Sequence, residues 1–188
     1  MNKEAAKKNL IIIHFLILIL VYVVSACTSN STKQDNKIIE AVISNEKDLV
    51  SLQLKELDFE KYKASAEKLL HSYFRQSYIE GMDKRHSVGA IHALSIKTPI
   101  IYKVSKVYTD AKKESKTVLI DSPVDDSTSR FYKRYIFKKE KDEWKLFQLR
   151  EHYVVMDGAA KDNYKRIIDL FTNYDGKPIE YSTVTIRE

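Results

Sequence analysis

The chain has 188 residues, of which 32 are Lys or Arg and 26 are Asp or Glu, giving a formal net charge of +6. Without its first 26 residues, which carry three lysines and one glutamate, it keeps 162 residues and a net charge of +4. That charge is too small to indicate a nucleic-acid partner, and 162 residues are the size of one domain. A single cysteine, Cys27, excludes a disulfide within the chain and a zinc site built from several thiolates.

The N-terminal segment has the parts of a secretory signal. Three lysines precede an apolar run from Leu10 to Val24, and the small residues Ser25 and Ala26 stand directly before Cys27. The stretch Val24-Ser25-Ala26-Cys27 resembles the lipobox of bacterial lipoproteins. That resemblance implies a diacylglyceryl group on the Cys27 sulfur, cleavage after Ala26 and anchoring at the extracytoplasmic face of the cell membrane. The alternative, an uncleaved transmembrane helix, is disfavoured because the 15-residue run is shorter than the roughly 20 residues that span a bilayer.

We therefore expect three parts: a signal peptide over residues 1–26, a polar tether over residues 27–36 and a single domain over residues 37–188. Thr28 to Asn36 are all polar or charged and cannot form a core. Between Ile38 and Leu57 the apolar residues first follow one helical face, then alternate from Val50 to Leu54. This pattern predicts a short helix followed by an extended piece.

The clearest helical pattern runs from Phe59 to Ile79, where apolar residues recur at spacings of three and four. We expect Asp58 to cap the start of this helix and Gly81 to stop it in a left-handed conformation. A second, short helix is expected over residues 88–94, with Ser87 as its cap.

After Pro99 the apolar period changes to two, which is typical of strands. Four strands joined by short polar links predict an antiparallel meander, with bounds Ile100–Tyr108, Thr117–Ile120, Arg130–Phe137 and Trp144–Val155. Aromatic residues on both faces predict that one face packs on the Phe59–Ile79 helix, while the other is partly covered or binds a partner. We expect Trp144 to be a buried core anchor that shares a face with Leu146; the alternative is a place at the rim of an open pocket.

The C-terminal segment adds a helix, a turn and a strand. Asp157 is expected to cap the helix, Asp175-Gly176 to turn the chain and Ile179 to Ile186 to form a terminal strand. The apolar stripe of the helix comprises Ala160, Tyr164, Ile167, Ile168 and Phe171. The domain is therefore expected to be α+β, with an N-terminal amphipathic helix packed on a curved antiparallel sheet of four or more strands and an added C-terminal helix and strand.

Two stretches resemble the nuclear transport factor 2-like superfamily. One is Ala66-Glu67-Lys68-Leu69-Leu70-His71-Ser72-Tyr73-Phe74, which runs on to Gly81, and the other is Phe137-Lys138-Lys139-Glu140-Lys141-Asp142-Glu143-Trp144-Lys145-Leu146. The resemblance covers about residues 59–155 and leaves the C-terminal tail outside the usual pattern. It implies a conical sheet with a pocket between helix and sheet, a scaffold that hosts enzymes and binding modules alike.

No catalytic residue, metal site or cofactor is predicted. The histidines after the leader are His71, His86, His92 and His152, and the six-residue spacing of His86 and His92 does not place them on one helical face. Asp125-Asp126 lacks the glycine and the distal glutamate of a calcium loop.

Basic residues alternate with aromatic ones in one strand: Arg130, Lys133, Arg134, Lys138 and Lys139 with Phe131, Tyr132, Tyr135 and Phe137. We interpret this stretch as a half-buried strand with its polar face in water, and the alternative is a surface for an anionic envelope polymer. Three functions remain open: a lipid-anchored non-catalytic binding or accessory module, which is preferred; an envelope enzyme with a small-molecule site; and a structural accessory of a membrane complex. The expected partners are membrane lipid through acylated Cys27 and an envelope protein or anionic polymer.

Overall fold

The computed structural model describes residues 31–89, 100–112, 114–123, 129–155 and 160–187. The chain divides into two units, Met1–Lys37 and Ile38–Glu188. In the first unit the described residues 31–37 are helical. Cys27, with the whole leader, lies outside the described residues, as do Asp157, His92 and the Asp125-Asp126 pair.

Helical structure in the second unit begins with a long helix that runs from Ile38 to residue 53. The expected extended piece from Val50 to Leu54 is therefore wrong. Val50 is 3% exposed and Leu52 is 1% exposed. Residues two positions apart in a helix point about 200° away from each other, so these two side chains are buried on different sides of the helix. This end of the helix is covered on more than one side, and such burial imitates the alternation of a strand.

The expected Phe59–Ile79 helix is instead two helices, α2 (Phe59–Leu69) and α3 (Ser72–Ser87), with a break between them. Asp58 caps α2 as predicted, because its carboxylate accepts the backbone N–H groups of Glu60 and Lys61. At the break, the backbone N–H of His71 donates to the carbonyl of Leu146 at 2.8 Å. The chain thus leaves the helix to pair with a strand, and α3 restarts with His71 Nδ1 accepting the N–H of Tyr73.

The predicted helix end at Gly81 is wrong, because Gly81 lies inside α3. Ser87 is the last residue of α3 and does not cap a following helix, and Val88 lies in the turn after it. The glycine that follows the end of α3 in a left-handed conformation is Gly89, whose φ is 72°. Residues 90–94 of the expected short helix lie outside the described residues.

The main sheet has six strands in the order β5-β4-β3-β1-β8, with β2 also pairing with β3. All five strand pairings in it are antiparallel. The strand bounds are β1 (Ile100–Ser105), β2 (Tyr108–Thr109), β3 (Ser115–Pro123), β4 (Ser129–Glu140), β5 (Glu143–Val155) and β8 (Tyr181–Arg187). The predicted antiparallel sheet of an α+β fold is therefore confirmed.

The β4–β5 hairpin turns through Lys141 and Asp142, whose φ angles are 50° and 67°. Two left-handed residues in a two-residue loop match the right-handed twist of the flanking strands. The register shifts after Ile136 of β4, because Phe137 pairs with Leu146 while Ile136 pairs with Gln148. Phe147 is thus the extra residue of a β-bulge, and Leu146 and Leu149 pack on the same core although they are three residues apart.

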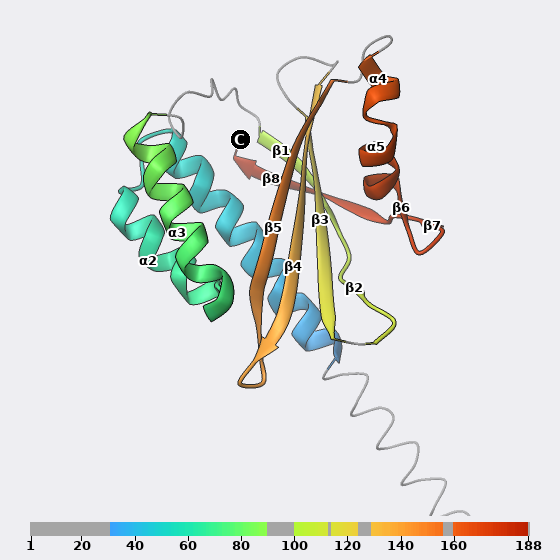
Figure 1. Cartoon of the computed structure of the whole chain (residues 1–188), viewed down its shortest axis with the longest axis horizontal. Coiled ribbons are helices and arrows are strands. Elements are labelled where there is room, and N and C mark those ends of the chain that lie inside the picture. Colours follow the sequence, from blue (N-terminus) through green and yellow to red (C-terminus); the bar gives the residue numbers. More distant parts are fainter. Residues whose placement is uncertain (1–30, 90–99, 113, 124–128, 156–159, 188) are drawn as a thin grey trace, which may run out of the picture. The chain divides into compact units, whose positions relative to one another are not determined.

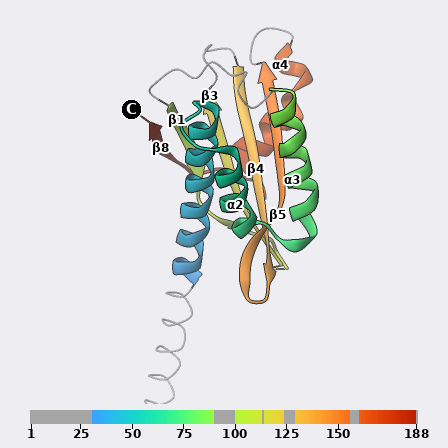
Figure 2. The same ribbon diagram turned by 90° about the vertical axis from the view of Figure 1, so that its left-hand side faces the viewer.

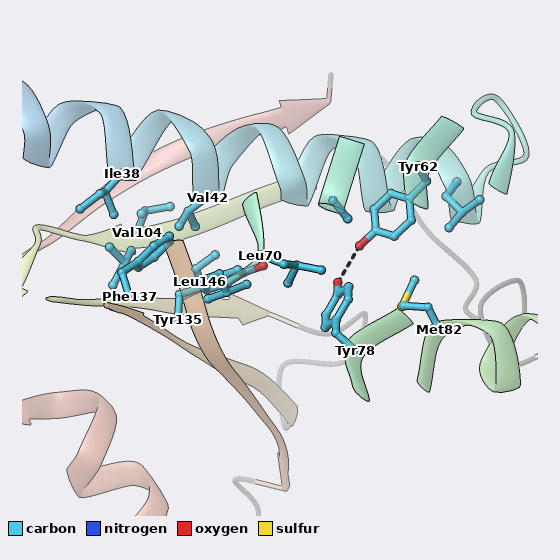
Figure 3. Packing of buried hydrophobic residues seen from close by; sticks show 14 residues of the cluster. Ile38, Val42, Tyr62, Leu70, Tyr78, Met82, Val104, Tyr135, Phe137 and Leu146 are labelled. Carbon is cyan, nitrogen blue, oxygen red and sulfur yellow. Dashed lines mark hydrogen bonds between the residues drawn. The ribbon is translucent and has the colours of Figure 1, made fainter. Parts of the chain in front are cut away.

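The larger core lies between the helices and one face of the sheet. It joins Ile38 and Val42 of the long helix to Tyr135, Phe137 and Leu146 of the hairpin, with α2 and α3 contributing at the other end (Figure 3). Figure 2 shows the long helix, α2 and α3 on one side of the sheet. Leu146 is 1% exposed, whereas Trp144 is half-buried and packs at the margin of this core.

A second, smaller core lies on the opposite face of the sheet. Figure 1 shows α4 (Ala160–Asn163) and α5 (Lys165–Thr172) on the side of the sheet opposite α2 and α3. Phe171 of α5 packs against Leu119, Tyr132 and Val154. The predicted stripe residues Tyr164, Ile167 and Ile168 pack there too. The chain then turns at Asp175-Gly176, as predicted, between β6 (Asn173–Tyr174) and β7 (Lys177–Pro178) before it enters β8.

Candidate functional site

The strongest candidate site is a group of polar side chains buried between the long helix and the sheet. We call it the buried polar cluster, and it comprises Asn45, Glu46, Lys133 and Tyr135. Glu46 is 0% exposed and Lys133 is 3% exposed, which is rare for charged residues unless they are paired. The cluster therefore marks a position where the fold tolerates two charges inside its core.

Helical and strand periodicity bring these residues together. Glu46 follows Val42 by four residues and Ile38 by eight, so it continues the buried stripe of the long helix. Lys133 precedes Tyr135 by two residues in β4, and this spacing puts it on the face that packs on the helix. Each charged residue thus interrupts an apolar stripe, and the two interruptions meet across the core.

The contacts inside the cluster leave neither oxygen of the Glu46 carboxylate without a partner. Lys133 Nζ donates to Glu46 Oε1 at 2.9 Å and to Oε2 at 2.7 Å. The Tyr135 hydroxyl also donates to Glu46 Oε1, and Asn45 Nδ2 donates to the Tyr135 oxygen at 3.1 Å. The pair is therefore both charge-compensated and hydrogen-bonded, which is the condition for a buried ion pair to be tolerated.

Burial and charge act on the pKa values of the cluster in different directions. Burial lowers the pKa of Lys133, but the negative charges of Glu46 and Glu151 outweigh it, so the pKa ends above its ordinary value. Burial and the Glu46 carboxylate both raise the pKa of the Tyr135 hydroxyl. At neutral pH, Lys133 is a cation and Tyr135 is a protonated donor, which fits the observed hydrogen bonds.

A line of alternating charges leads from the cluster towards the surface. Lys133 Nζ lies 3.8 Å from Glu151 Oε1 of β5, and Glu151 Oε2 lies 3.5 Å from the Arg85 guanidinium of α3. The side chains of Glu151 and Arg85 are 29% and 45% exposed. On another side, burial raises the pKa of Tyr102 to about 12, with the charge of Glu46 as a further cause.

The core beside the cluster contains a second polar contact. The hydroxyls of Tyr62 in α2 and Tyr78 in α3 lie 2.8 Å apart, and either can be the donor (Figure 3). Burial raises the pKa of both hydroxyls, so both stay protonated at neutral pH. This contact ties the two halves of the broken helix together inside the core.

The chemistry open to the cluster is limited by its own bonds. A protonated Lys133 has no lone pair with which to attack a substrate. The Glu46 carboxylate, which would act as a general base, already accepts hydrogen bonds from Lys133 and Tyr135. The arrangement fits a structural charge pair that selects one packing of helix on sheet.

The three described histidines among those singled out in the sequence, His71, His86 and His152, do not come together. His71 caps α3, His86 stacks on Phe59 with ring centroids 3.9 Å apart, and His152 contacts Phe171 edge-on. Within the part of the chain that the structure describes, no group of His, Cys, Asp and Glu side chains could hold a metal ion.

The basic residues of the alternating strand fall into different environments. Lys133 is buried, so the interpretation of the stretch as a polar face in water is wrong for this residue. Arg130 lies 3.5 Å from Asp121 of the neighbouring strand. Lys138 and Lys139 lie over the rings of Phe147 and Trp144.

Glu46 was not among the residues singled out in the sequence, and only a weak signal points to it. A glutamate in an apolar helical stripe and a lysine in an apolar strand face are each common at a domain margin. Their opposite signs become informative once the helix is known to pack on the strand, and 87 residues separate them.

Comparisons with known proteins leave the fold and the site as the basis for inference: no family model, no curated protein and no solved structure matches the chain. Among the described residues, no helix is both long enough and apolar enough to cross a membrane.

Proposed function

We propose that this chain is a bacterial cell-envelope lipoprotein, held at the extracytoplasmic face of the cell membrane by acyl chains on Cys27. Its domain is a non-catalytic binding or accessory module. The coincidence of a basic start, an apolar run and Ser25-Ala26 before Cys27 supports the anchor. Removal of residues 1–26 would leave Cys27 as the first residue, with residues 27–36 connecting it to the domain.

The observation that carries the non-catalytic part is the saturation of Glu46. This carboxylate is the most deeply buried acid of the helix–sheet interface, and Lys133 and Tyr135 occupy both of its oxygens. A general base must be within reach of a substrate proton and able to accept it. Glu46 instead acts as an internal counter-ion, which supports a domain that works through its surface.

The finer architecture belongs to the same proposal. An N-terminal helical layer on a curved sheet would make the domain a nuclear transport factor 2-like scaffold, with the C-terminal helix and strand as an addition to it. The packing of the helices on one face of the antiparallel sheet supports this assignment, and the second core, around Phe171 of α5, belongs to the addition.

The anchor is tested by expressing the chain in a bacterium and comparing wild type with Cys27→Ala. The wild-type chain is expected in the membrane fraction, with an intact mass that starts at Cys27 and includes diacylglyceryl. Cys27→Ala is expected to stay uncleaved at Ala26 and to lack thioether-linked lipid. A mature wild-type chain that begins at Cys27 and carries no lipid mass would contradict the proposal.

The second candidate is an envelope enzyme with a small-molecule site between helix and sheet. The buried Lys133–Glu46 pair, placed in that interface, is the observation that favours it. A working site must admit a small molecule, so we would treat the folded protein with a small amine-reactive reagent and map the modified lysines. Protection of Lys133, while the exposed Lys103 and Lys165 react, supports the module. Rapid modification of Lys133 in the folded protein would favour the enzyme.

A further inference from the structure

Aromatic rings and lysines gather around the β4–β5 hairpin and the adjoining start of α3. We call this region the basic–aromatic patch, and it comprises Tyr73, Lys138, Lys139, Trp144 and Phe147. The Trp144 ring also contacts Lys116, which is buried at 5% exposure. Tyr73 is 78% exposed, the largest exposure among the large hydrophobic side chains that the structure describes as exposed. A single exposed ring is ordinary, but Tyr73 stacks on Phe147 and so belongs to a larger aromatic group.

Each indole or phenyl ring of the patch has a lysine above it. Lys116 Nζ lies 4.9 Å from the centre of the Trp144 ring and Lys139 Nζ lies 5.8 Å from it. Lys138 Nζ lies 4.2 Å from the centre of the Phe147 ring. The same ring stacks on Tyr73 at 5.3 Å and meets His71 edge-on at 5.5 Å. The hairpin therefore carries lysines and rings on both of its faces, because Lys138 lies on the opposite face from Lys139 and Trp144. Cation–π contacts hold the rings in place.

The acidic residues of the same hairpin are engaged in local bonds. Glu140 accepts the backbone N–H of Ser72 at 3.3 Å. Hydrogen bonding to Ser72, first through its side chain and then through this N–H, lowers the pKa of the Glu140 carboxyl group. Glu143 pairs with Lys145 at 2.8 Å. Asp142 lies at the tip, and the net charge of residues 138–145 remains positive, with four lysines and three acids.

The patch lies at the end of the domain from which the chain runs back to its N-terminus. Figures 1 and 2 both show the tip of the β4–β5 hairpin at the same end of the second unit as the beginning of its long helix. The core agrees, because Ile38 packs beside Phe137, while Met82 lies at the opposite end (Figure 3). Ten residues lie between Cys27 and Ile38, so even a fully extended connection holds Ile38 within about 40 Å of an anchor at Cys27.

We propose that the basic–aromatic patch docks on the anionic phospholipid headgroups of the membrane that holds the acyl chains. Trp and Tyr rings settle at the level of the headgroups, and lysines near the surface are attracted by anionic lipids. The short connection to Cys27 lets this end of the domain reach the bilayer, where a weak surface acts at a high effective concentration. The domain is thus laid on the membrane in one orientation, with α5 and the second core away from the patch.

This inference rests on the proposed lipid anchor, and the chain allows the two to be tested apart because Trp144 is its only tryptophan. The acylated protein, verified by intact mass, is reconstituted into vesicles of phosphatidylglycerol or of phosphatidylcholine, each with lipids brominated at the upper acyl chain. Bromine quenches indole on contact, so the emission of Trp144 reports whether the patch meets the bilayer. The anchor itself is read from the mass and fails or holds independently of the quenching.

Quenching is expected to be several-fold larger in phosphatidylglycerol than in phosphatidylcholine and to fall as salt is raised from about 0.05 M to about 0.5 M. Lys138→Gln/Lys139→Gln is expected to lose most of it. The matched control Lys84→Gln/Lys165→Gln removes the same charge from exposed positions on α3 and α5 and is expected to keep it.

Three results would overturn the proposal. One is an acylated protein whose Trp144 emission is no more quenched in anionic than in zwitterionic vesicles. Another is equal loss of quenching in the patch variant and the control variant. The third is a Trp144 response to a soluble anionic polymer, such as polyphosphate, with no response to the lipid, which would assign the patch to an envelope polymer.

Discussion

Replacing Lys133 by Met tests whether the buried polar cluster is a structural charge pair. The substitution keeps most of the side-chain volume and removes the charge that compensates Glu46. The carboxylate, 0% exposed, would keep only the hydrogen bond from Tyr135. Breaking one side of a buried ion pair typically costs about 3–5 kcal/mol of folding free energy. Against a typical domain stability of about 5–15 kcal/mol, this loss is large.

The double variant Glu46→Gln/Lys133→Met removes both charges and leaves an amide oxygen that can accept the Tyr135 hydroxyl. Because replacing a whole buried pair is often neutral or stabilising, we expect the double variant to recover most of the loss. The loss of unfolding free energy in the double variant should then be smaller than the sum of the losses in Glu46→Gln and Lys133→Met by about 1–3 kcal/mol, as for residues in direct contact. Lys103→Met, which removes an exposed lysine from β1, is the control and should change stability by less than about 0.5 kcal/mol.

The assay is urea unfolding followed by the fluorescence of Trp144, the only tryptophan. Wild type and variants are compared at equal slope, so that a shifted midpoint reports stability alone. A Lys133→Met midpoint within error of wild type would refute the burial of the pair. A double variant whose loss equals the sum of the single losses would refute the contact between Glu46 and Lys133.

Three further outcomes are expected. Because the folded pKa of Tyr102, about 12, exceeds the value of about 10 expected in the unfolded chain, its contribution is full below pH 10 and is lost as the pH rises through 12. Tyr102→Phe should therefore flatten the fall of stability with pH in that range, by at most about 3 kcal/mol in total, and an unchanged slope would contradict this. Asp142→Gly relieves a non-glycine residue at φ 67° and should raise stability by up to about 1 kcal/mol in thermal unfolding, whereas a loss would show that the aspartate side chain holds the turn. Leu146→Ala should cost about 2–5 kcal/mol and Tyr73→Ser less than about 0.5 kcal/mol in urea unfolding, and similar costs would disprove their assignment to core and surface.

Local chemistry explains what the sequence predicted well. The strands of the sheet follow from alternation, since Tyr135 and Phe137 reach one core while Tyr132 reaches the other. The Asp58 cap and the Asp175-Gly176 turn depend on neighbours within a few residues, and both occur as expected.

Longer-range contacts explain the structural features that the local sequence pattern does not predict. The break after α2 forms because the N–H of His71 finds the carbonyl of Leu146, 75 residues further along. A continuous helical pattern from Phe59 to Ile79 contains no sign of that partner. Leu146 is buried in the core as predicted. Trp144, predicted to be a buried anchor on the same face, is only half-buried and has two lysines over its ring. The face of the sheet on which Trp144 lies was predictable, whereas the extent of its burial depends on Lys116 and Lys139, which lie on two other strands.

The buried polar cluster illustrates the same limit for a site. Periodicity places Glu46 on the buried stripe of the helix and Lys133 on the buried face of the strand. Either residue alone would be read as a charged residue at the margin of the core. Their pairing depends on the long helix packing over β4, which is a contact between segments 87 residues apart.

The central claim, a lipid-anchored envelope protein, is tested most directly by the intact mass of the wild-type chain purified from bacterial membranes. The account predicts a chain that begins at Cys27 and carries the mass of a thioether-linked diacylglyceryl group. A membrane-bound chain that still begins at Met1, or a mature chain without lipid mass, would contradict it.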